Sequence, residues 1–99
     1  MAAVTGVQLV VGRQSDAIVP GGDAVSATLT CPAGSSAVAG GYRLVFEDPN
    51  DESALSGLVV SVNGPVPPSS WEVTVILPAV SRPLAGAVRL QAEATCVGG

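Results

Sequence analysis

The chain contains no histidine and no lysine, and its only cations are four arginines. Histidine and lysine supply most general bases and activate most serine nucleophiles, so the usual acid–base and triad mechanisms lack their parts. A serine without an activating partner is a weak nucleophile. We therefore predict that the protein is not an enzyme.

Charge of either sign is scarce, since charged residues make up 12% of the 99 residues and the net charge is −4. The cations are scattered along the chain, at Arg13, Arg43, Arg82 and Arg89. Nucleic acids and anionic membrane surfaces both attract clustered basic residues. We expect neither nucleic acid nor a membrane as a partner.

Long hydrophobic runs are also missing. No apolar run approaches the roughly 18 residues of a membrane-spanning helix, and residues 1–6 have neither the basic start nor the apolar segment of a signal peptide. We expect no membrane span and no signal peptide here. The protein would then stay where it is made, leave by cell lysis, or be cut from a longer exported chain.

Only three residues are aromatic, namely Tyr42, Phe46 and Trp71. The core must therefore consist mainly of valine, alanine and leucine, and β-branched side chains favour strands over helices. Apolar residues nevertheless make up 47% of the chain, and the mean hydropathy is +0.51. A monomer of this size cannot hide so much apolar surface, so we expect it to associate with itself or with a larger assembly.

Alternation of apolar and polar residues predicts strands and no helix. Residues 24–31, 71–77 and 87–96 alternate most regularly, and each run has one apolar face. These faces hold Val25, Ala27, Leu29 and Cys31; Trp71, Val73, Val75 and Leu77; and Val88, Leu90, Ala92, Ala94 and Cys96.

Two further runs alternate less regularly. In residues 37–47 one face holds Val38, Gly40, Tyr42, Leu44 and Phe46, and in residues 58–63 it holds Leu58, Val60 and Val62. Glycines inside a strand indicate a bulge or the close approach of another backbone or ring. Residues 48–57 read as a polar loop, and prolines within residues 64–70 exclude a helix or a central strand there.

Six or seven short strands separated by turns predict an all-β fold. We expect a small antiparallel β-sandwich or barrel with long loops and no substantial helix. The single sandwich domain would span residues 13–99. Residues 1–12 are apolar and poorly alternating, so we expect an N-terminal arm or edge strand that could pair with a neighbouring chain.

The two cysteines are the first candidates for a special role. Cys31 and Cys96 each end the inward face of a strand, so both side chains could enter one core. Taken alone, these positions allow either a disulfide or two buried reduced thiols. Two cysteines without histidine leave a zinc site short of ligands, so we predict no metal there.

Two other features invite a functional interpretation. The acidic residues 47–52 offer oxygen ligands to calcium, but the spacing is not that of an EF-hand loop, and a solvated loop is the favoured interpretation. Trp71 is favoured as a core aromatic packed near the glycines, and an exposed ring that stacks on a sugar or protein is the alternative. We predict no metal and no cofactor.

Four segments together resemble a recurrent small β-domain with the pattern CPxG…GGG(Y/F)…W.V…A.C, found in phage virion proteins and at the ends of exported bacterial proteins. The resemblance covers residues 31–96, about two-thirds of the chain, and Ala39 stands where a first glycine is often seen. It implies that Cys31 and Cys96 pair. The segments are residues 31–34, 39–42, 71–73 and 92–96.

The resemblance and the composition favour a non-enzymatic virion structural protein. We expect a phage capsid decoration (cement) protein, or an accessory head or tail protein, at the virion surface. Its partners would be other virion proteins, the major capsid protein first, and itself; the oligomeric state stays open, and a homotrimer is one possible arrangement because cement proteins are often trimeric. The predicted partner-binding residues are Val4, Val7, Leu9, Val11 and Trp71.

The alternative is an extracellular adhesion or carbohydrate-binding β-module from a bacterium. In that case Trp71, Tyr42 and the loops would form the contact face. A module of this kind would act outside the cell rather than on a virion.

Overall fold

The computed structural model describes residues 6–67, 69–78 and 83–98. Its elements are six strands and one short 3₁₀ helix. They are β1 (Val7–Ala17), β2 (Val25–Thr30), β3 (Ser35–Phe46), η1 (Pro49–Leu55), β4 (Val59–Val66), β5 (Ser70–Ile76) and β6 (Val88–Gly98).

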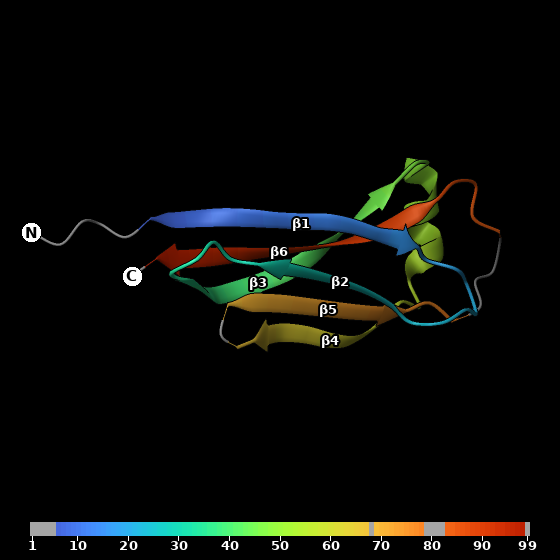
Figure 1. Cartoon of the computed structure of the whole chain (residues 1–99). Coiled ribbons are helices and arrows are strands. Elements are labelled where there is room, and N and C mark those ends of the chain that lie inside the picture. Colours follow the sequence, from blue (N-terminus) through green and yellow to red (C-terminus); the bar gives the residue numbers. More distant parts are fainter. Residues whose placement is uncertain (1–5, 68, 79–82, 99) are drawn as a thin grey trace, which may run out of the picture.

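The strands form two three-stranded antiparallel sheets packed face to face, which confirms the predicted all-β sandwich (Figure 1). Sheet A has the order β1-β6-β3, and sheet B has the order β2-β5-β4. The central strands β6 and β5 therefore each have a neighbour on both sides. The start of β1 and the end of β6 lie at one end of the molecule, and η1 lies at the other.

Regular alternation on the central strands produces the core. Every second residue of β5 and β6 points between the sheets, and Val73, Val75, Val88 and Leu90 have no exposed surface. The predicted inward faces of β2, β5 and β6 are all confirmed. The core is thus made mainly of small branched side chains, as the shortage of aromatic residues requires.

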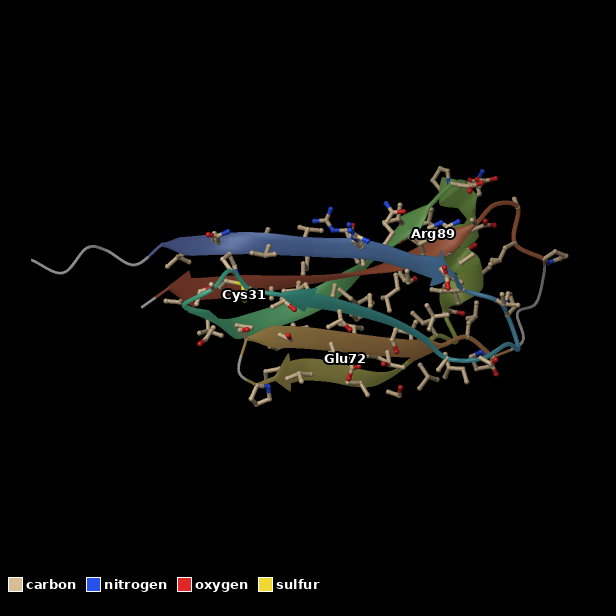
Figure 2. The ribbon with its side chains drawn as sticks, in the orientation of Figure 1. Cys31, Glu72 and Arg89 are labelled. Carbon is tan, nitrogen blue, oxygen red and sulfur yellow. A yellow bond between two sulfur atoms is a disulfide. The ribbon has the colours of Figure 1, made fainter. Side chains whose placement is uncertain are left out.

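A disulfide joins Cys31 to Cys96, as the resemblance implied (Figure 2). Cys31 follows the last residue of β2 in sheet B, whereas Cys96 lies in β6, the central strand of sheet A. Their Cα atoms are 5.8 Å apart, and 65 positions separate them in sequence. The bond therefore connects the two sheets covalently.

Strand β1 is an edge strand of sheet A and continues past the predicted boundary between residues 12 and 13. Residues 7–11 pair with β6 in one unbroken register, and shifts occur only after Val11. Gly12 packs against β2 of sheet B, because a β-carbon on it would come within 3.1 Å of both Leu29 Cβ and Thr28 O. Residues 7–12 are thus one continuous strand with the residues that follow.

Strand β3 contains a bulge that the alternation did not reveal. The register with β6 shifts between Ala37 and Ala39, and Val38 is 60% exposed. The prediction that Val38 shares the inward face is therefore wrong, because the extra residue at the bulge reverses the parity of the strand. Ala37 takes the inward position instead, opposite Cys96.

Strand β4 corrects two further predictions. It extends through Pro65 to Val66, beyond the predicted end at residue 63, while the prediction that prolines exclude a central strand there holds. It is an edge strand, where proline is tolerated because one side of its backbone needs no hydrogen bond. A register shift between Val60 and Val62 also places these two residues on opposite faces, not on the same face as predicted.

The predicted polar loop at residues 48–57 contains the 3₁₀ helix η1. Asp48 caps it by accepting a hydrogen bond from the backbone N–H of Asn50 at 2.9 Å, and Pro49 occupies its first turn. Both residue types favour helix N-termini. The helix has seven residues, so the prediction of no substantial helix holds.

Gly40 and Gly41 make a matched test of the packing. A β-carbon on Gly40 would overlap the indole ring of Trp71, whereas one on Gly41 would meet no atom within 4 Å. We expect Gly40→Ala to lower the free energy of unfolding by about 1–3 kcal/mol through overpacking. Gly41→Ala should leave it unchanged or slightly higher, because alanine restricts the unfolded chain.

Urea unfolding of both variants measures this difference. Equal midpoints for Gly40→Ala and Gly41→Ala would contradict the packing of Gly40 against Trp71.

Candidate docking surface

An apolar strip runs along the outer face of sheet A, on the side away from sheet B. We define it as Val7, Leu9 and Val11, which are 69%, 63% and 42% exposed. They lie opposite Val97, Thr95 and Glu93 of β6. Because alternate residues of a strand share a face, the three side chains point the same way while Val10, between them, packs against the core.

A hollow of about 270 Å³ adjoins the strip. It crosses sheet A from β1 to β3, and Gly41 leaves room above the sheet because no side chain stands there. Leu9 borders it on the β1 side and Ala39 on the β3 side. The residues around it are Leu9, Ala39, Gly40, Gly41, Tyr42, Glu93, Ala94 and Thr95.

The charges beside the hollow are paired. Nη2 of Arg43 lies 2.9 Å from Oε2 of Glu93, and Nε of Arg43 donates to the same oxygen at 3.2 Å. An exposed pair of this kind contributes at most about 1 kcal/mol to stability. Its main effect is to neutralise the charge of both side chains at this place, so the strip and the hollow lie on a surface with little local charge.

The outer face of sheet B differs in character. Exposed Val59, Val62, Val66 and Ile76 lie on β4 and β5, and hydroxyl groups and the Glu72 carboxylate share the face with them. Ser26 Oγ and Thr74 Oγ1 are 2.7 Å apart, and Thr30 Oγ1 and Ser70 Oγ are 3.1 Å apart. The outer face of sheet A is the better candidate for docking because its apolar residues adjoin a hollow.

Trp71 lies in the core and not on this surface. It is 9% exposed, and its indole N–H donates to Asn63 Oδ1 at 2.9 Å. The ring packs over Gly40. The favoured interpretation of Trp71 as a core aromatic is therefore confirmed. The ring is covered, so Trp71 is not among the residues that a partner could contact on this surface.

The structure brings Val7, Leu9 and Val11, three of the predicted partner-binding residues, together on one exposed face. Val4 lies outside the described residues. The hollow was not predicted from the sequence. The two adjacent glycines lie on opposite faces of β3, so Gly40 makes room for Trp71 in the core and Gly41 leaves the hollow open on the outer face.

The acidic segment at residues 47–52 has a structural role at Asp51. This carboxylate is fully buried. It accepts hydrogen bonds from the backbone N–H groups of Ala85, at 3.0 and 3.1 Å to its two oxygens, and of Gly86, at 3.0 Å. Asp51 therefore fastens η1 to the chain entering β6, and its oxygens are directed at backbone amides and not at solvent.

Within residues 6–67, 69–78 and 83–98, no three acidic or cysteine side chains are grouped closely enough to hold a metal ion. The same residues include no helix with the length and apolar character needed to span a bilayer.

The chain matches no protein-family model, no curated protein and no solved structure.

Removing the Asp51 carboxylate should loosen this end of the molecule. We expect Asp51→Ala to lower the free energy of unfolding by about 2–4 kcal/mol, because charged hydrogen bonds are lost and backbone donors are left unpaired. Glu52→Ala, at an exposed position of the same turn, should change it by less than about 0.5 kcal/mol.

Chemical denaturation of the two variants provides the comparison. If Asp51→Ala unfolds at the same denaturant concentration as Glu52→Ala, the anchoring role of Asp51 is wrong.

Proposed function

We propose that this chain is a non-enzymatic structural protein of a phage virion, either a capsid decoration (cement) protein or an accessory head or tail protein. It stabilises the particle by docking the outer face of sheet A onto other virion proteins, with the major capsid protein as the first candidate. The observation that carries this proposal is the apolar strip beside a hollow on a face with little local charge.

The strip suits docking for a physical reason. Its side chains are already ordered on a paired strand, so little conformational entropy is lost when a partner covers them. The hollow over Gly41 can receive a single apolar side chain, which is how interface anchors usually bind. A stable interface needs about 800 Å² on each partner, more than three side chains offer, so the partner must also cover β6 and β3.

The composition and the disulfide support the same function. Charged residues are few, and the centre of an interface is typically depleted of charge. The disulfide suits a protein that meets oxidising conditions outside the cell, as a released virion does. The resemblance of residues 31–96 to domains of phage virion proteins supports a structural role.

The second candidate is an extracellular bacterial adhesion or carbohydrate-binding module. The polar atoms of Glu93 and Thr95 at the hollow favour it, since sugar sites combine such groups with a shaped cavity. The burial of Trp71 counts against it, because the only tryptophan is not available for stacking on a sugar.

Virion association tests the first candidate directly. Particles purified on a density gradient from cultures that carry the gene should contain this protein, co-sedimenting with the major capsid protein. If the protein is made in these cultures but is absent from the particles, the proposal fails. A thermal-shift screen of the isolated protein on a glycan panel should show no response, and a reproducible shift would favour the second candidate.

Add-back to particles that lack the protein tests the surface. The wild-type chain should bind and raise the temperature at which the particles release their genome. Ala39→Arg, which places a long charged side chain at the hollow, should abolish binding. Thr28→Arg, an exposed substitution on sheet B, is the matched control and should bind normally. Equal binding by both variants would show that sheet A is not the docking face.

A further inference from the structure

The hydrogen bonds between β1 and β6 show which backbone N–H and C=O groups of β1 have no partner in sheet A. The backbone N–H of Gly98 donates to the carbonyl of Gly6 at 3.1 Å, and the register continues with Val7 opposite Val97. Hydrogen-bonded and non-hydrogen-bonded pairs alternate along an antiparallel ladder. Even-numbered residues 6, 8 and 10 therefore bond to β6, and the N–H and C=O groups of Val7, Leu9 and Val11 point away from the sheet.

This part of the edge has none of the features that keep strands from pairing. Residues 7–11 contain no charge, no proline and no bulge. Proteins normally interrupt exposed edges by such means, because free main-chain groups recruit another strand. A free, uncharged and regular edge is therefore a site for strand addition.

Each of the other described edges has an interruption or a neighbouring strand. Strand β3 has the bulge at Val38, and β4 has Pro65 and a register shift after Val60. Strand β2 is approached by β1, since Gly12 lies against Thr28 and Leu29. A two-fold pairing through residues 7–11 uses the β1 edge of both chains, so this contact closes at two chains.

We propose that β1 pairs antiparallel with β1 of a second copy of this chain, across a two-fold axis at Leu9. In this register Leu9 faces Leu9 of the second copy, and Val7 faces Val11. These are the residues whose main-chain groups point outward, so each facing pair would exchange two hydrogen bonds. The two sheets A become one six-stranded sheet, and this inference does not rest on the proposed function.

The register is also favourable for the side chains. Every cross-strand pair on the outer face is apolar with apolar, which stabilises antiparallel pairs. Arg13 lies outside the paired segment and does not face itself. The two apolar strips would join into one continuous strip, whose side chains partly cover one another across the axis.

Light scattering after size exclusion tests the dimer. At micromolar to millimolar concentration the mass should approach twice the 9.7 kDa of one chain. A monomer at every concentration overturns the proposal, and so does a trimer or an open-ended series.

Charge substitution at the axis tests the register. Leu9→Lys should raise the dimer dissociation constant at least about tenfold, because like charges then face each other directly. An equal mixture of Leu9→Lys and Leu9→Glu should restore the dimer. Val38→Lys, at a site of similar exposure, is the control and should dimerise like wild type. A dimer that withstands Leu9→Lys overturns the proposal.

Cysteine substitution gives a second, independent test. Paired residues at the axis have Cα atoms about 5.5 Å apart, which suits a disulfide. Leu9→Cys should therefore form a covalent dimer on mild oxidation, while Val11→Cys should not, since it faces Val7. Mixed Val7→Cys and Val11→Cys chains should cross-link with each other. Equally fast cross-linking of Leu9→Cys and Val11→Cys alone would disprove the register.

Discussion

The covalent bond between Cys31 and Cys96 is the constraint on which the rest of the structure depends. It links the end of β2 in sheet B to the central strand of sheet A at a Cα–Cα distance of 5.8 Å. A core of valine, alanine and leucine buries little area per residue, so a small domain built from it is only marginally stable without a staple. By holding the sheets together at this end, the bond lets a modest core define one structure.

The opposite end of the sandwich is held by a different interaction. Asp51 accepts backbone hydrogen bonds from Ala85 and Gly86, and so fixes η1 against the chain that enters β6. The two fastenings act on β6 from both ends, and β6 in turn positions β1 by the ladder over residues 7–11. The apolar strip and the hollow are therefore presented on a rigid base, which is what docking without large entropy loss requires.

Much of the fold could be predicted from alternation, and the failures have physical causes. The inward faces of β2, β5 and β6 follow from a period of two, which holds wherever a strand is regular. It fails at Val38 and between Val60 and Val62, because a bulge reverses parity without leaving a clear mark in the sequence. The prolines correctly excluded a central strand, but that β4 continues through Pro65 as an edge strand depends on strand order, which alternation does not contain.

The surface was predictable only in part. Val7, Leu9 and Val11 could be predicted to bind a partner from the apolar character of the run, but its poor alternation did not show that they share a face. The hollow could not, since it requires β1, β6 and β3 to be neighbours and Gly41 to face outward. Trp71 was ambiguous for a similar reason: its burial depends on Gly40 from the opposite sheet.

Comparing the unfolding free energy of the oxidised protein with that of the Cys31→Ala/Cys96→Ala double variant tests the central role of the disulfide most directly. Opening a loop of 65 positions should lower it by about 4 kcal/mol in the chain-entropy description. The variant should also lose amide protection in β1 and β6 together, since both strands depend on the same bond. A double variant with the stability and amide protection of the oxidised protein would contradict this account.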